Sequence, residues 1–224
     1  MSNPCNPTGV TRSGDELAAL IKSADDSKGI LFDEAYEFFH DHGPVSAMRY
    51  INDLERGNLF VVGAATKGLQ APGIRIGWVV SSKSNIEILS NFSSFGMGGV
   101  SHLSQRYALA LFEKSRIAKA HVAVPRYYQS QRERYGKAFE ELGLKLFTGN
   151  GGFYHWCKLP GELNAEEFNQ RLFKEKAAIL KGADCDMARL GHKSPLRQFF
   201  RFSFGPLEPS SFDSDLEIMQ KALR

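Results

Sequence analysis

The chain has 224 residues, of which 42% are hydrophobic and 24% charged, and its formal net charge is only +3. This composition is that of a globular protein long enough to bury its own core, and it excludes a disordered chain. The weak positive charge gives no case for binding to nucleic acid or an anionic membrane, and no apolar run reaches the roughly 20 residues of a membrane-spanning helix.

The first part of the chain alternates between predicted helices and strands. Residues 11–26 predict a helix, because Leu17, Leu20 and Ile21 form an apolar stripe at the i, i+3, i+4 spacing. Strands interleaved with helical segments favour an α/β sheet covered on both faces. Three short apolar runs predict these strands: 29–36, 58–66 and 73–81.

The pattern changes toward the C-terminus. Residues 84–143 are mainly helical in pattern, and we expect Pro125 and the glycines at 96–99 to break them into shorter helices. After Gly143, four strands are predicted at LKLFT, GGFYHWCKL, AAILKG and FFRFSFG, and two helices at NAEEFNQRLFKEK and SSFDSDLEIMQKAL. This change predicts a second, smaller α+β domain.

The three cysteines, Cys5, Cys157 and Cys185, are widely spaced and include no CxxC pair. An odd number of separated cysteines argues against both a disulfide framework and a metal site. We therefore expect a cytoplasmic protein. The chain also opens almost directly on a turn-rich segment, and a domain seldom begins on a tight loop, so we expect it to be a piece of a longer protein.

Two polar segments stand where strands end or turns form. Asn6 carries an amide in a Pro-Gly turn (NPTG), which by itself indicates only a turn. Asp33 and Tyr36 (DEAY) come at the end of the predicted strand 29–36. Because open α/β sheets bind ligands beyond the carboxyl ends of their strands, these two side chains are candidates for a site. A solvated acidic loop is the alternative.

Two further segments carry cations in unusual surroundings. Lys67 follows the strand 58–66 among small residues, so its amine can lie in a dry niche where it is nucleophilic and able to form a Schiff base. Arg75 opens the strand 73–81 and offers a planar fork suited to phosphate. Arg201 alternates with aromatic residues in FFRFSFG, and a buried guanidinium requires an anion. That anion is either a ligand or a structural ion-pair partner.

In this order and spacing, NPTG, DEAY, TKGLQAPGIRIGW and RFSFG resemble the class I/II aminotransferases, which are fold-type I pyridoxal-phosphate enzymes. The resemblance covers essentially the whole chain. It implies an α/β fold in which residues 1–120 are the C-terminal portion of a large cofactor-binding domain with a mostly parallel sheet. Residues 121–224 would form a small α+β domain. Family members usually work as dimers, which implies a homodimer.

The resemblance assigns roles around the cofactor ring. Lys67 would bind pyridoxal 5'-phosphate as a Schiff base and then act as the general base. Asp33 would pair with the pyridine nitrogen, because a carboxylate there keeps the ring an electron acceptor. Asn6 and Tyr36 would donate hydrogen bonds to the phenolic oxygen.

Three other residues would bind anionic groups. Thr66 and Arg75 would bind the cofactor phosphate, and Arg201 would bind the α-carboxylate of the substrate. Ala64 stands where the family usually has a hydroxyl residue, so we expect fewer phosphate contacts. The family's upstream glycine-rich turn, stacking ring and further strands have no counterpart in residues 1–224, so this chain alone would bind the cofactor poorly.

The sequence thus predicts a pyridoxal-phosphate-dependent aminotransferase that acts on an amino acid and a 2-oxo acid, without a metal. One alternative is a β-lyase or decarboxylase on the same scaffold, since the motifs do not distinguish reactions of this cofactor. Another is a non-catalytic chain: either an inactive fragment or the ligand-sensing module of a transcriptional regulator.

Overall fold

The computed structural model describes residues 1–224. The chain forms two compact units: the first comprises Met1–Cys5 and Thr11–Arg126, and the second comprises Asn6–Val10 and Tyr127–Arg224. The second unit therefore includes the NPTG turn from the start of the chain. One long helix, α4 (Lys114–Glu141), runs from the first unit into the second.

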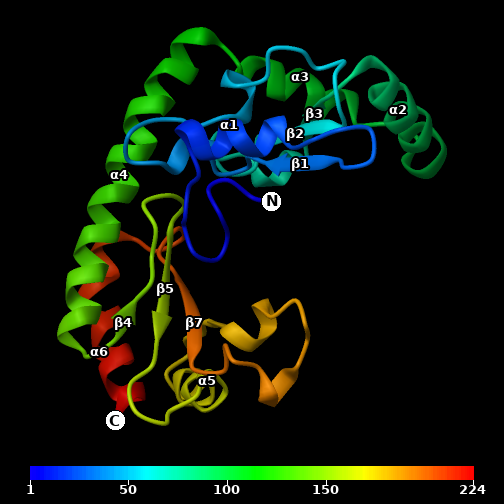
Figure 1. Ribbon diagram of the computed structural model, residues 1–224. Helices are drawn as coiled ribbons and strands as arrows, with labels where there is room; N and C mark the ends of the chain where they lie inside the picture. The colour runs from blue at the N-terminus through cyan, green and yellow to red at the C-terminus, as the bar shows by residue number, and fades with distance from the viewer. The chain divides into compact units, whose positions relative to one another are not determined.

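The secondary structure has the following bounds (Figure 1). The other helices are α1 (Gly14–Lys22), α2 (Lys83–Met97), α3 (His102–Leu111), α5 (Ala165–Lys174) and α6 (Phe212–Leu223). The strands are β1 (Ile30–Asp33), β2 (Leu59–Ala64), β3 (Gly77–Val80), β4 (Lys145–Leu146), β5 (Tyr154–Lys158), β6 (Leu180–Lys181) and β7 (Phe199–Ser203).

The first unit contains a three-stranded sheet of order β1-β2-β3. β1 and β2 are parallel, with Asp33 opposite Val62, whereas β3 is antiparallel to β2, with Gly77 opposite Ala64. The α/β fold is confirmed, whereas the sheet that was expected to be mostly parallel is mixed in this unit, because β3 runs antiparallel to β2. The last residues of β1 and β2 and the first residue of β3 consequently lie at one edge of the sheet.

The predicted stripe of α1 forms the core of this unit. Leu17 and Ile21 are buried and pack in one cluster with Phe32, Leu59 and Val61 of the sheet. The i, i+4 spacing on the helix and the alternation along β2 bring these side chains to the same side. Burying each such side chain stabilises the fold by about 1.5–3 kcal/mol.

Pro125 lies inside α4, so the prediction that it breaks the helix was wrong. An interior proline costs about 3 kcal/mol, because it removes one hydrogen bond and crowds the preceding turn. Here Val124, Pro125 and Tyr128 are all buried. Packing of the long helix outweighs the local preference.

No helix of the protein has both the length and the apolar character needed to cross a bilayer.

The second unit is built on an antiparallel sheet of order β4-β5-β7-β6. Its core is rich in aromatic rings. Tyr135 of α4 contacts Phe202 and Phe204, with ring centroids 5.0 and 6.2 Å away, and its hydroxyl donates to Asp215 over 2.7 Å. The strands predicted after Gly143 all form, but each is shorter than its apolar run.

His155 of β5 is a neutral core residue. It is 2% exposed, and its Nε2 donates to the backbone carbonyl of Arg132 over 3.0 Å. A neutral ring that donates from Nε2 accepts at Nδ1, where the Thr148 hydroxyl lies 3.1 Å away. Burial lowers the pKa of His155 to about 4.

This buried histidine predicts a loss of stability in acid. An unfolded histidine has a pKa of about 6.5, so between that value and about 4 the unfolded state binds one more proton than the native state. The contribution of His155 to the free energy of unfolding therefore falls by up to about 3 kcal/mol as the pH falls through this window. His155→Gln removes this contribution. The difference in the free energy of unfolding between wild type and His155→Gln should therefore change with pH inside this window and stay constant outside it.

The measurement is denaturant unfolding in a Trp78→Phe background, in which Trp156, the neighbour of His155, is the only tryptophan left to report by fluorescence. His192→Gln is the control, because His192 is exposed in the same unit. A difference between wild type and His155→Gln that stays constant from pH 4 to pH 7 would contradict a neutral His155.

Candidate functional site

Five of the predicted site residues lie at one edge of the sheet in the first unit. Asp33 ends β1, and β2 ends at Ala64 just before the loop that carries the lysine. β3 runs in the opposite direction, so the segment that leads into it starts from the same edge. The residues gathered there are Asp33, Tyr36, Thr66, Lys67 and Arg75.

Lys67 is half-buried, and its amine lies next to the loop that follows β1. The Nζ atom is 6.0 Å from the centroid of the Tyr36 ring, at the outer limit of a cation–π contact. Tyr36 is itself buried, with 8% of its surface exposed. The structure thus brings the predicted nucleophile and one predicted cofactor contact together.

A glycine holds these two loops in contact. A Cβ placed on Gly68 would lie 2.3 Å from the Phe38 ring, closer than any real side chain packs. Phe38 is buried, and its ring contacts that of His121 of α4 at a centroid distance of 4.8 Å, with the ring planes tilted by 50°. Only glycine lets the loop after Lys67 approach the loop after Tyr36 this closely, which fixes the amine near the end of β1.

Asp33 and Glu34 point in different directions from the end of β1. The Asp33 carboxylate is half-buried and accepts the N–H of Ala35 over 3.1 Å. Glu34 is buried and accepts from the N–H of Ala47 and the hydroxyl of Ser46, each over 2.6 Å. No role was predicted for Glu34, although alternation along a strand turns its side chain to the opposite face from that of Asp33. Glu34 anchors the loop and leaves Asp33 at the sheet edge.

Burial raises the carboxyl pKa values in this loop. The pKa of Glu34 is raised mainly by burial, and that of Glu37 is raised to about 7 by burial and by the charge of Glu34. Two carboxyls in one partly dry loop resist ionising together. Of the two, Glu37 therefore changes its charge near neutral pH.

Arg75 does not begin a strand as predicted. It precedes β3 and ends a short 3₁₀ turn, with φ at +51° in the left-handed region. Its guanidinium is exposed, and Nη1 donates to the carbonyl of Pro72 over 2.9 Å. Gln70, in the same loop, has φ at +53°. Non-glycine residues adopt this conformation at a cost, and such strain concentrates at binding loops.

Arg201 and Asn6 form a second group of predicted residues, and both belong to the second unit. Nη1 of Arg201 donates to Oδ1 of Asn6 over 2.8 Å, and the guanidinium carbon lies 4.5 Å from the centroid of Tyr154. The Nε of Arg201 is buried and has no hydrogen-bond partner. A planar guanidinium with an unused buried donor is suited to a carboxylate.

Neither the contact between Arg201 and Asn6 nor the position of Tyr154 beside the guanidinium was predicted from the sequence. The two hydrogen-bonded side chains are 195 positions apart, and no local pattern links them. Tyr154 lies two residues from Trp156, which pairs with Arg201 across the sheet. Alternation along β5 places Tyr154 on the same face of the sheet as Arg201, but only once that pairing is known.

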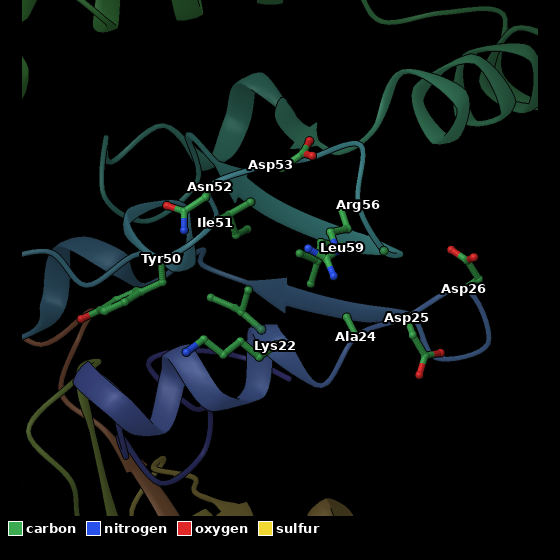
Figure 2. A pocket seen from close by; sticks show the side chains of 12 residues that line it. Lys22, Ala24, Asp25, Asp26, Tyr50, Ile51, Asn52, Asp53, Arg56 and Leu59 are labelled. Carbon is green, nitrogen blue, oxygen red and sulfur yellow. The ribbon is translucent and has the colours of Figure 1, made fainter.

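The first unit also has an open pocket of about 620 Å³, which is separate from the sheet edge that carries Lys67 (Figure 2). Its lining comes from the end of α1, the segment before β1, residues 50–53 and the beginning of β2. Because β2 begins at the pocket and ends at the lysine loop, pocket and candidate site occupy opposite ends of the sheet. None of the predicted site residues lines it.

The chain matches the family model described as aminotransferase class I and II over residues 1–209. It is 30% identical over 165 residues to the uncharacterized HTH-type transcriptional regulator YdfD of Bacillus subtilis, a match that covers 70% of this chain and 34% of that protein. It is 29% identical over 189 residues to histidinol-phosphate aminotransferase of Thermotoga neapolitana, covering 80% of this chain and 52% of that enzyme.

The fold is also similar to solved structures. An aminotransferase from Staphylococcus aureus superposes with a TM-score of 0.83 at 19% identity, covering 100% of this chain and 57% of that chain. At this identity the likeness establishes the fold alone. The chain spans about half the length or less of the two curated relatives named above.

Proposed function

Since this chain belongs to the aminotransferase class I and II family, whose enzymes depend on pyridoxal 5'-phosphate, we propose that it is part of an enzyme that exchanges an amino group between an amino acid and a 2-oxo acid. The observation that carries this proposal is the convergence of the Lys67 amine and the Asp33 carboxylate on one sheet edge, with Tyr36 beside the amine.

The residues of this edge fit the cofactor. Lys67 would hold the cofactor covalently through its amine, and the same amine would move a proton at the substrate α-carbon. Asp33 holds the pyridine nitrogen in its protonated form. Tyr36 would donate to the phenolic oxygen, and by family resemblance we propose the same role for Asn6, which belongs to the second unit. When bound, the cofactor withdraws electrons from the bonds at the substrate α-carbon.

Two further contacts hold anionic groups. We propose that Arg75 and Thr66 bind the cofactor phosphate; the exposed Arg75 side chain gives up one backbone contact, to Pro72, to do so. Arg201 binds the substrate α-carboxylate through its planar guanidinium. Asn6 keeps the guanidinium plane oriented through its 2.8 Å hydrogen bond.

The organisation of the protein follows from the same proposal. The first unit corresponds to the C-terminal portion of a large cofactor-binding domain, which we expect at 1–120. The second unit corresponds to the small domain, which we expect at 121–224. The protein works as a homodimer. We propose a cytoplasmic location, since an odd number of widely spaced cysteines suits a reducing compartment.

Product analysis tests the reaction. The protein is incubated with pyridoxal 5'-phosphate, a panel of amino acids, and pyruvate or 2-oxoglutarate as amino acceptor. We expect the 2-oxo acid of the donor and the amino acid of the acceptor in equal amounts. Release of an amine with carbon dioxide, or elimination of the donor side chain, would instead identify a decarboxylase or a β-lyase.

The similarity to YdfD favours a second candidate, the ligand-sensing module of a transcriptional regulator. Such a module keeps the lysine and the cofactor but needs no turnover. Covalent labelling of Lys67 by the cofactor together with no product from any amino acid of the panel would support the sensor and contradict the aminotransferase.

A further inference from the structure

Arg201 is held by neutral groups and not by an acid. Its Nη1 donates to the Asn6 side chain over 2.8 Å, and its guanidinium carbon lies 4.5 Å from the centroid of the Tyr154 ring. None of the ion pairs of the chain involves Arg201. A carboxylate partner would neutralise the guanidinium and compete with an anionic ligand for its donors. An aromatic ring attracts the cation through its π electrons and leaves the charge uncompensated.

Tyr154 is a rigid support for this cation. It is 2% exposed, and its ring contacts that of Phe153 at a centroid distance of 4.7 Å. On the other side of Phe153 in the sequence, Gly152 has φ at +69°, and a Cβ placed on it would lie 3.2 Å from Cδ2 of Tyr154. A close-packed ring cannot change its rotamer without displacing these neighbours. The ring therefore offers the guanidinium one fixed position.

The pairing of two strands sets the distance between the ring and the guanidinium. β5 and β7 run side by side and antiparallel, with Trp156 opposite Arg201, so Tyr154 is the diagonal neighbour of Arg201 on the same face (Figure 1). Diagonal neighbours are close enough for an aromatic ring to meet a long side chain. Both residues belong to the second unit, so the contact depends on the fold of that unit alone.

We propose that Tyr154 is a positioning residue, whose ring holds the Arg201 guanidinium in the orientation that receives the substrate carboxylate. Asn6 fixes one terminal nitrogen and the ring fixes the central carbon, so two points of the guanidinium are set before a substrate binds. Binding then costs less side-chain entropy than it would with a freely rotating arginine. This inference rests on the role of Arg201 in the proposed function and adds a residue that acts through it.

Steady-state kinetics test the role of the ring. Tyr154→Leu should raise the KM for the amino acid about 3- to 30-fold with a smaller change in kcat, because it removes the π electrons and keeps apolar bulk. Tyr154→Phe keeps the ring and should stay within about twofold of the wild-type KM. Phe139→Leu is the matched control: Phe139 is buried against Phe202, which faces the side of β7 opposite to Arg201, and its KM should not change. Should Tyr154→Leu fail to fold, a fluorinated phenylalanine at position 154 keeps the shape, weakens the π electrons and should raise the KM.

A double-mutant cycle and a binding measurement complete the test. In the Arg201→Ala background, Tyr154→Leu should raise the KM no further, because the ring acts through the guanidinium. Propionate, a carboxylate that cannot react, is titrated while NMR follows the Nε–H signal of Arg201, and Tyr154→Leu should weaken its binding by the same factor as the KM.

Three results would overturn the proposal: an unchanged KM in Tyr154→Leu, a Tyr154→Phe variant as impaired as Tyr154→Leu, or additive effects in the double variant. Propionate binding that depends on the ring, without any transamination product, would contradict only the proposed function. Product formation with a KM that does not depend on the ring would contradict only the role of Tyr154.

Discussion

Replacing Lys67 with Ala is expected to abolish covalent attachment of pyridoxal 5'-phosphate and to lower transamination by at least about 10³-fold. The variant removes both the nucleophile that attaches the cofactor and the base that moves the proton. The fold should persist, because Lys67 is half-buried and contributes no side chain to the core cluster of α1 and the sheet.

The attachment is measured without relying on activity. Borohydride reduction of the wild-type chain after incubation with the cofactor should fix the added mass on the peptide that contains Lys67. Lys22→Ala is the control, since Lys22 lines the pocket at the opposite end of the sheet and should leave the labelling intact. Added mass on a different lysine, or full activity of Lys67→Ala, would refute the assignment.

The second large effect is expected at Arg201. Arg201→Ala should raise the KM for the amino acid about 10- to 100-fold with a smaller change in kcat, because each hydrogen bond from a charged donor is worth about 1.5–3 kcal/mol. Arg201→Lys should recover little of the loss, because an ammonium lacks the planar fork that binds a carboxylate with two parallel bonds.

The control for this prediction is Arg197→Ala, which removes an exposed guanidinium four residues earlier. Its KM should equal that of the wild type. An amine that carries the same side chain as the substrate but no carboxylate should bind wild type and Arg201→Ala equally. If Arg201→Ala leaves the KM for the amino acid unchanged, the guanidinium does not bind the substrate.

The sequence predicted the strands of the first unit and the residues at their ends. Asp33 and Lys67 each follow an apolar run, and parallel strands bring their carboxyl ends to one sheet edge. A local pattern was enough there, because strand direction converts positions in the sequence into positions in space. Local residue preferences wrongly predicted a helix break at Pro125 and a strand start at Arg75, because burial of α4 and a left-handed turn outweigh them.

What the sequence alone determined is therefore the α/β fold, the family and the candidate residues, since these depend on periodicity and on short motifs. Only the tertiary structure decided which of them touch. The Arg201–Asn6 hydrogen bond joins residues near opposite ends of the chain, and Gly68 matters because the Phe38 ring fills the space of its missing side chain. The same holds for α2, whose pattern predicts an amphipathic helix while only the packed chain leaves its apolar side in solvent. Contacts between distant segments come from the packing of the whole chain, and no local spacing records them.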